Sequence, residues 1–165
     1  MPVELFWKQD GLGVRPIREA QTLRMALLVD IKNSGEDAVN PLLDQHSGNL
    51  LSLELTAEDD AASVLLYSGE ERLEVRYNQQ EKRLMVLNAQ GKEIGRYRGS
   101  VDDVDIGDEP IHFTCYLDHS LLEIYLNDIK SVSLRNYFTE PRYFQISGAV
   151  QQLKLWELSS AYPEN

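Results

Sequence analysis

Apolar residues recur at every second position through most of this 165-residue chain. The pattern is plainest from Ile111 to Leu117 and from Leu122 to Leu126, where apolar and polar or outward positions alternate. Successive side chains of an extended strand point to opposite faces, so this spacing predicts half-buried strands and not helices. The link Asp118-His119-Ser120 is short and supplies side chains that can satisfy turn N–H groups. The two runs therefore predict a β-hairpin.

The same alternation predicts further strands, separated by short turns rich in Gly, Pro, Asn and Ser. They cover Leu50–Leu55, Ser63–Tyr67, Leu73–Tyr77, Leu84–Leu87, Glu93–Arg98, Ser131–Tyr137, Tyr143–Ser147 and Val150–Leu158. Many short strands at such spacing are typical of two packed antiparallel sheets. We predict an all-β fold, a two-sheet antiparallel β-sandwich of the concanavalin-like or lectin-like jelly-roll kind.

Helical character is confined to Pro16–Arg24, because Pro suits a first helical turn and Glu19, Ala20 and Leu23 favour helix. We expect at most one short helix, near residues 16–24. Residues 33–41 and 45–49 are interpreted as polar surface loops. No linker or repeat divides the sequence, and a chain of this length buries enough surface to fold as one domain over residues 1–165.

The charge balance limits the partners of the chain. Its 16 Lys and Arg residues face 27 Asp and Glu residues, for a net charge of −11 at pH 7. Phosphate backbones and anionic lipids would be repelled on average, so we expect neither nucleic acid nor a membrane as partner. Met1–Lys8 lacks a cationic stretch followed by an apolar one, which predicts a cytoplasmic protein if Met1 is the natural start.

Residue types that occur in catalytic and metal sites are present, but their spacing assembles no known site. Asp118-His119-Ser120 contains the types of a nucleophilic triad, yet adjacent residues of an extended chain point to opposite faces and cannot relay a proton. We interpret them as a turn. His46 and His112 lack the spacing of zinc ligands. Cys115 lies in an alternating apolar run, which predicts a buried core thiol.

Carboxylate pairs and clusters occur that could in principle serve glycoside hydrolysis or calcium binding. The first needs two carboxyl groups roughly 5 to 9 Å apart, one of them kept protonated by its surroundings. Asp118 and Glu123 flank the predicted turn, but Glu123 falls on the face away from the core, so we expect Asp118 to brace the turn and Glu123 to make an exposed contact. The acidic run 101–110 does not match an EF-hand loop, and Glu58-Asp59-Asp60 is likewise interpreted as a solvated loop. No metal or other cofactor is predicted.

Aromatic side chains offer a possible platform for sugars, whose C–H faces pack on rings. The candidates are Trp7, Tyr67, Tyr77, Tyr97, Tyr125 and Tyr137. We single out Trp7 and Tyr125 as glycan contacts. Trp156 lies in the apolar last strand and is expected in the core. A geometric cluster of rings is required for binding.

Three segments, in order along the chain, resemble a known family. The run LDHSLLEIYLND, Leu117–Asp128, resembles the strand-turn-strand of the C-terminal β-sandwich of glycoside hydrolase family 32, which typically reads Val-Asp-X-Ser, Val-Glu-Val-Phe and Asn-Asp-Gly. PIREAQTLR, Pro16–Arg24, resembles the junction between the catalytic domain and the sandwich of that family, and LKLWEL, Leu153–Leu158, resembles its closing strand. The structural residues that this resemblance implies are Pro16, Glu19, Leu23, Arg24, Asp118, Ser120, Glu123, Asn127, Asp128 and Trp156.

The resemblance divides the single domain into a junction segment (1–24), a sandwich (25–158) and a tail (159–165). Ile129 replaces the glycine of Asn-Asp-Gly, which permits a tight turn, so a different turn is expected. Asn88-Ala89 stands where many members carry Asp-Arg, and Asn136-Tyr137-Phe138 replaces an Arg-X-Tyr-Pro-like stretch. The chain is therefore identified as a divergent member.

The chemistry of this family belongs to a separate five-bladed propeller, with an Asp nucleophile in Asn-Asp-Pro-Asn, an Arg-Asp-Pro motif and an acid/base Glu in Glu-Cys. The present sequence contains no Asp-Pro dipeptide, and Cys115 follows Thr114 and not Glu. The resemblance thus implies that this chain alone is not an enzyme and that its parent is a β-fructofuranosidase acting on sucrose or fructans.

Three functions follow as hypotheses. The first is the accessory sandwich of a β-fructosidase, whose partner is a catalytic propeller in cis or as a split protein, and whose junction exposes an unusually large apolar patch. The second is a free-standing carbohydrate-binding module that binds fructan or another glycan. The third is a protein-interaction or dimerisation module, with a homodimer as the expected assembly.

Overall fold

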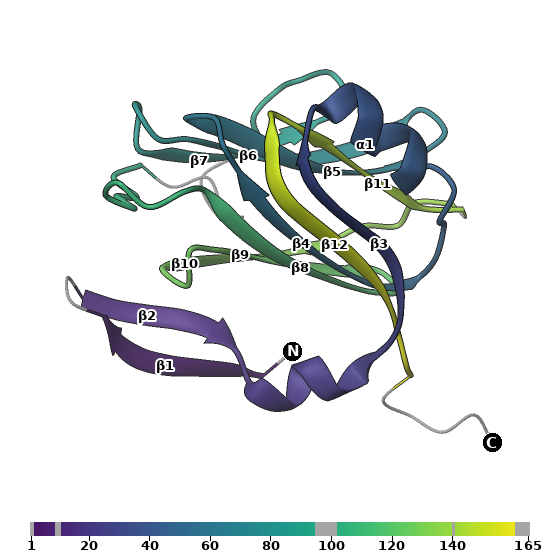
Figure 1. Cartoon of the computed structure of the whole chain (residues 1–165), viewed down its shortest axis with the longest axis horizontal. Helices are drawn as coiled ribbons and strands as arrows, with labels where there is room; N and C mark the ends of the chain where they lie inside the picture. Colours follow the sequence, from purple (N-terminus) through teal and green to yellow (C-terminus); the bar gives the residue numbers. More distant parts are fainter. Residues whose placement is uncertain (1, 9–10, 95–101, 140, 161–165) are drawn as a thin grey trace.

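The computed structural model describes residues 2–8, 11–94, 102–139 and 141–160. Two antiparallel sheets pack face to face, and a two-stranded hairpin lies beside them (Figure 1). The larger sheet has the order β10-β9-β8-β4-β12-β3, the smaller has the order β11-β5-β6-β7, and β1 pairs with β2. The strands are β1 (Val3–Lys8), β2 (Gly11–Pro16), β3 (Arg24–Ser34), β4 (Leu50–Ala57), β5 (Ala61–Ser68), β6 (Glu71–Asn78), β7 (Arg83–Asn88), β8 (His112–Asp118), β9 (Leu121–Leu126), β10 (Lys130–Arg135), β11 (Tyr143–Ser147) and β12 (Val150–Leu158).

The core lies between the two sheets. Alternate residues of each strand point into it, among them Leu53 and Cys115 from the larger sheet and Val64 and Val75 from the smaller. These side chains are at most 1% exposed. Burying an aliphatic side chain of this size contributes about 1.5–3 kcal/mol, so the packed inner faces hold the fold together. The predicted all-β sandwich is confirmed, as is Cys115 as a core thiol, and burial raises the pKa of that thiol.

The predicted hairpin is formed by β8 and β9, with Asp118 opposite Leu121. Its turn places His119 at a positive φ of 52°. The other predicted strands are present with shifts at their ends, except Glu93–Arg98. Glu93 forms only an isolated bridge with Leu87, and residues 95–98, with the candidate Tyr97, lie outside the described residues.

Strands β1, β2 and β3 were not predicted. β3 is an edge strand of the larger sheet, and only Val29 among its residues is fully buried. A strand with one covered residue does not show the clean alternation of a half-buried strand. The hairpin of β1 and β2 forms a separate two-stranded sheet and buries few side chains, so its pattern was equally weak.

The expectation of at most one short helix was wrong. A 3-10 helix, η1 (Arg18–Leu23), occurs within the predicted segment, but an α-helix, α1 (Glu36–Leu43), occupies much of the predicted loop 33–41. Val39 and Leu43, four residues apart, lie on one face of α1 and are fully buried in the core. Pro41 and the short length hid this helix in the sequence. Among the described residues, no helix is long and apolar enough to cross a membrane.

Helix α1 covers part of the edge of the smaller sheet, and its Asn40 bonds to the backbone there. Asn40 Nδ2 donates to the carbonyl of Ile146 at 3.0 Å, and Asn40 Oδ1 accepts from the Ile146 N–H at 2.9 Å. Ile146 lies on the edge strand β11, whose backbone groups would otherwise be open to another strand. The amide of Asn40 therefore takes the place of a neighbouring strand at this position.

Replacing Asn40 by Ala is expected to lower the free energy of unfolding by about 1–3 kcal/mol, because the Ile146 N–H and C=O lose their partners. Urea denaturation followed by circular dichroism measures this change. The exposed replacement Asp37→Asn on the same helix is the control and should change the free energy by less than about 0.5 kcal/mol. Equal losses for the two variants would contradict the role given to Asn40.

Candidate functional site

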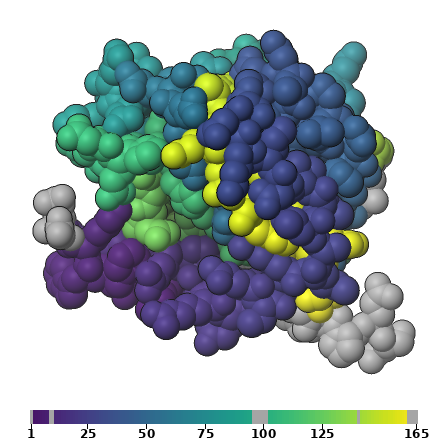
Figure 2. All heavy atoms as spheres, viewed as in Figure 1, coloured from purple at the N-terminus to yellow at the C-terminus, as the bar shows by residue number. Residues whose placement is uncertain are grey.

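The N-terminal segment, residues 2–8 and 11–24, covers part of the outer face of the six-stranded sheet. Figure 2 shows this segment lying against the body of the molecule. Ala20 of η1 packs with Tyr116, Tyr125 and Leu158 in a second buried cluster, separate from the main core. Val14, Ile17, Leu23 and Leu50 pack around it. The segment is thus fixed to the sandwich by an apolar contact of its own.

Arg24 fixes the end of the segment. Its guanidinium Nη2 lies 2.5 Å from Glu54 Oε1 and 3.3 Å from Ser52 Oγ, and its Cζ lies 3.9 Å from the ring centroid of Trp156. A guanidinium held over an indole ring and paired with a carboxylate is a favourable cation–π arrangement. Trp156, expected in the core, is instead half-buried on the outer face, because its alternating neighbours Leu155 and Leu153 occupy the inner face.

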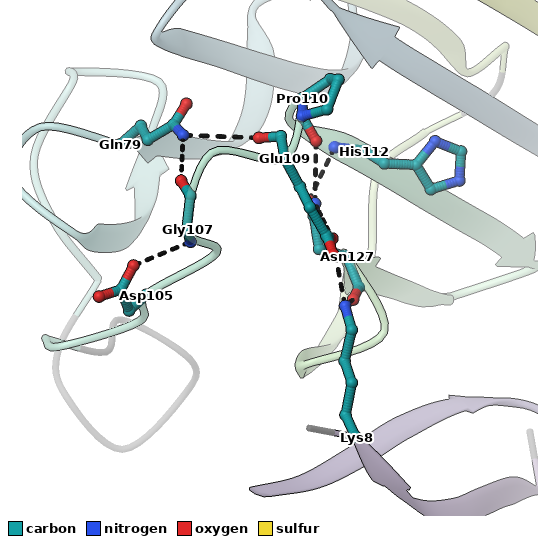
Figure 3. Close-up of polar contacts among 8 residues, drawn as sticks. All are labelled: Lys8, Gln79, Asp105, Gly107, Glu109, Pro110, His112 and Asn127. Atoms are coloured by element: carbon teal, nitrogen blue, oxygen red, sulfur yellow. Dashed lines mark hydrogen bonds and ion pairs between the residues drawn. The ribbon is translucent and has the colours of Figure 1, made fainter. Parts of the chain in front are cut away.

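Asn127 joins the β1–β2 hairpin, the acidic loop formed by residues 102–110, and strand β8 at one point (Figure 3). Its Oδ1 accepts from the His112 N–H at 2.8 Å, and its Nδ2 donates to the Pro110 carbonyl at 2.8 Å. Its backbone carbonyl accepts from Lys8 Nζ at 3.0 Å. Lys8 also pairs with Glu109 Oε2 at 3.2 Å, and the hydrogen bond from Lys8 lowers the pKa of Glu109.

The neighbouring turn fixes β2. The Val14 N–H donates to the Asp128 carbonyl at 2.8 Å. Asn127 and Asp128 both adopt positive φ, 47° and 54°, a conformation that Asn and Asp tolerate. Ile129 does not adopt positive φ, so isoleucine in place of the glycine of the family motif adds no backbone strain to the turn. A Cβ on Gly13 would lie 2.9 Å from the Asp128 carbonyl oxygen, so only glycine permits this close approach.

Two clefts border the segment. One of about 600 Å³ lies between the hairpin and the acidic loop, and Lys8, Leu12, Asp105 and Glu109 contribute to its walls. The carboxylate of Asp105 forms an ion pair with Lys82 and accepts a hydrogen bond from the Gly107 N–H at 2.9 Å. Both contacts lower the pKa of that carboxyl. Among the described residues, no three His, Cys, Asp or Glu side chains are placed to hold a metal ion.

The second cleft, about 360 Å³, lies under η1 and contains His112, Glu54 and Arg15. His112 Nδ1 is 2.9 Å from Thr56 Oγ1, and its Nε2 is 3.2 Å from Thr114 Oγ1. Burial lowers the pKa of this histidine, since desolvation disfavours the charged ring.

The outer face of the hairpin is apolar and uncovered. Val3, Leu5, Trp7 and Leu12 are 45%, 62%, 85% and 56% exposed. Trp7 lies opposite Leu12 in the hairpin register, so their side chains share one face. Met25 and Leu27 at the start of β3 are also exposed, at 69% and 51%. These exposed apolar residues lie in and beside the junction segment, where an unusually large apolar patch was expected. We call Val3, Leu5, Trp7 and Leu12 the hairpin patch.

The candidate glycan contacts are separated by the fold. Trp7 is exposed on the hairpin patch, whereas Tyr125 is 1% exposed beneath the N-terminal segment and has no ring face free for a sugar. Tyr77 is also buried and donates to the Val104 carbonyl at 2.6 Å. Tyr137 is 80% exposed. These rings form no common platform.

The catalytic interpretations find no support in the geometry. His119 Nδ1 lies 2.8 Å from Asp118 Oδ1, but both side chains are exposed, and Ser120 contributes its carbonyl to Asn136. Glu123 lies opposite Tyr116 and not beside Asp118. The expected exposure of Glu123 was wrong, because it is only 7% exposed and accepts from Ser133 Oγ at 3.5 Å.

Several contacts at the turns were not recognised in the sequence. The buried Arg142 donates to Asn49 Oδ1 at 2.5 Å, to the His119 carbonyl at 3.1 Å and to the Phe138 carbonyl at 2.8 Å. It therefore takes part in holding the β8–β9 turn. No local pattern marks such a residue, because Asn49 and His119 are 93 and 23 residues away in the sequence and only Phe138 is near. The same holds for Lys8 and Glu109.

Replacing Asn127 by Ala should destabilise the protein by about 2–4 kcal/mol, because it removes two short buried hydrogen bonds and places Ala at positive φ. Chemical denaturation measures the loss. Asn127→Gly keeps the backbone conformation unstrained and isolates the side-chain contribution. A glycine variant as stable as the unmodified protein would show that these bonds do not hold the loop.

Lowering the pH from 7.5 to 5.5 should reduce stability through His112. Its folded pKa lies below the unfolded value near 6.5, so the unfolded chain binds the proton more readily and stability falls as the pH drops through that value. In His112→Gln, the thermal denaturation midpoint should change less with pH over this range than it does in the unmodified protein. An unaltered slope in His112→Gln would contradict the assignment.

Comparison with known proteins supplies the family. Residues 19–157 match the family described as "Glycosyl hydrolases family 32 C terminal". No curated protein matches the chain significantly. The solved structure of sucrose-6-phosphate hydrolase from Lactobacillus gasseri is similar, with a TM-score of 0.72 and 19% identity over 96% of this chain and 33% of that chain.

Other enzymes of the family give the same result. A family 32 β-fructofuranosidase from Bombyx mori matches with a TM-score of 0.67 and 18% identity over 98% of this chain and 33% of that one. Fructan 1-exohydrolase IIa from Cichorium intybus matches with a TM-score of 0.65 and 16% identity over 97% and 41%. At these identities the structures show the fold, and this chain spans about a third of the first two enzymes. The chain therefore belongs to glycoside hydrolase family 32, as its C-terminal domain, which lacks the catalytic propeller.

Proposed function

We propose that this chain is the accessory β-sandwich of a β-fructosidase and that its hairpin patch packs against the catalytic domain. The observation that carries the proposal is the contrast between the two sides of the hairpin. The Lys8 side chain and the Val14 N–H bond the hairpin to the sandwich, and Gly13 permits the close approach, while the outer face of the hairpin exposes Leu5 and Trp7. Exposed apolar groups gathered on one face are typical of a surface that a partner covers.

The position of the hairpin supports the same partner. It lies N-terminal to the matched region, which begins at residue 19, while the similar enzyme structures align with 96% to 98% of this chain. The alignments thus extend into the hairpin, within chains that are much longer than this one. A rigid hairpin between a catalytic domain and the sandwich would transmit the position of one to the other.

The function of the chain in this proposal is mechanical. It would stabilise the catalytic domain by covering part of its surface, and the substrate would be bound by that domain. The names of the similar structures, a sucrose-6-phosphate hydrolase, a β-fructofuranosidase and a fructan exohydrolase, support a β-fructoside as the substrate of the parent enzyme. A second copy of this chain is the competing occupant of the hairpin patch.

The direct test is the variant Trp7→Ser. Its binding partner in the assay is the family 32 catalytic domain encoded in the same genome. Removing the large exposed ring should weaken association of the two polypeptides by at least about tenfold, the effect of losing roughly 1.4 kcal/mol of apolar contact. Isothermal titration calorimetry measures the dissociation constant. Tyr137→Ser removes an equally exposed ring from another part of the surface and serves as the control.

Light scattering of the isolated chain separates the two occupants. A monomer that binds the catalytic domain through Trp7 supports the proposal. A stable dimer that Trp7→Ser converts to monomer, with no binding to the catalytic domain, would replace it with self-association. Unchanged affinity in Trp7→Ser would also exclude the hairpin patch as the docking surface.

A further inference from the structure

A pair of stacked tyrosines lies on the outer face of the four-stranded sheet. Tyr67 on β5 and Tyr143 on β11 are register partners, with ring centroids 5.3 Å apart and planes at 24°. The next residue of each strand, at positions 68 and 144, is turned to the other face, and Phe144 is in the core. Alternation therefore places both tyrosine rings on the side away from the core.

The orientation of Tyr67 is fixed from the far end of its ring. Its hydroxyl donates to Asp44 Oδ1 at 2.7 Å, and Gln145 Nε2 donates to the same carboxylate at 3.2 Å. Asp44 is the C-cap of α1, so the helix end holds the ring. Desolvation and the Asp44 carboxylate raise the pKa of Tyr67, which keeps its hydroxyl protonated as a donor.

A small pocket lies beside this ring. Its volume is about 360 Å³. It is lined by Tyr67, Gly69, Glu70, Arg72, Ala89 and Gln145. Arg72 on β6 is the register partner of Tyr67 on the side opposite to β11. Tyr143 thus supports one side of Tyr67, while the pocket opens between Tyr67 and Arg72.

The rim of this pocket carries unused polar groups. The side chains of Arg72 and Glu70 are exposed, and neither forms a hydrogen bond or ion pair with another described residue. Arg72 supplies several N–H donors in a plane, and Glu70 supplies two acceptor oxygens. Donors and acceptors placed around an apolar ring match a sugar, which has C–H groups on its ring face and hydroxyl groups at its edge.

The charges favour a neutral ligand. Glu70 lies beside the pocket, and the chain carries a net charge of −11, so a phosphate or nucleotide would be repelled. A neutral saccharide meets no such penalty and uses both Arg72 and Glu70. We propose that this pocket binds a neutral saccharide ring, which stacks on Tyr67 and hydrogen-bonds to Arg72 and Glu70.

This site is independent of the docking surface proposed above. The β5–β11 sheet and the hairpin lie on opposite sides of the six-stranded sheet (Figure 1). A catalytic domain packed on the hairpin patch would therefore lie on the side of the sandwich away from Tyr67. The sandwich would then hold a glycan chain near the enzyme at a second point, which raises the local concentration of a polymeric substrate.

Affinity electrophoresis in native gels tests the proposal, with inulin, levan and dextran as three neutral polysaccharides. At least one of them should retard the unmodified protein. Tyr67→Ala should weaken the retardation by at least about tenfold, as expected for the loss of a ring contact. Arg72→Ala should weaken it as well, and it removes an exposed side chain that the fold does not need. Tyr67→Phe keeps the ring and should retain most of the binding.

Tyr137→Ala is the matched control, because it removes an exposed tyrosine that does not line the pocket, and this variant should bind as the unmodified protein does. Absence of retardation by all three polysaccharides would overturn the proposal, as would equal retardation of Arg72→Ala and the unmodified protein. Trp7→Ser should still be retarded. Loss of docking with retained glycan binding, or the reverse, therefore separates the failure of one proposal from that of the other.

Discussion

The apolar contact between the inner faces of the two sheets is the interaction on which the rest of the structure depends. Side chains such as Leu53, Cys115 and Val75 are fully or almost fully buried there. Because successive side chains of a strand alternate, burying these residues sends their neighbours to the outer faces. The outer faces are therefore positioned by the core, while their composition is free to serve contacts with other segments or molecules.

The outer faces of the two sheets differ in what covers them. On the larger sheet, Tyr116, Tyr125 and Trp156 are covered by the N-terminal segment, and Arg24 and Asn127 fix that segment in place. The hairpin patch is thereby presented on a firm support, as a docking surface requires. On the smaller sheet, Tyr67 keeps one side open to a pocket. One sandwich thus offers separate surfaces for a protein partner and for a glycan.

Sequence patterns predicted those elements whose side chains alternate strictly. The β8–β9 hairpin, the core position of Cys115 and the family motifs at Arg24 and Asn127 were all accessible in this way. The α1 helix was not, since Pro41 and Asn40 are unusual within a helix and only contacts with the core and β11 stabilise it. Edge strand β3 was missed because too few of its residues are covered to show a period.

The sequence by itself determined the fold class and the family, because alternation and short motifs are local properties of the chain. Tertiary structure decided which aromatic rings are accessible to a ligand. Tyr125 and Tyr67 both alternate outward from the core, yet the N-terminal segment covers Tyr125, while α1 anchors only the hydroxyl of Tyr67. Whether an outward side chain meets solvent depends on segments distant in sequence that pack over it, and no local pattern records that packing.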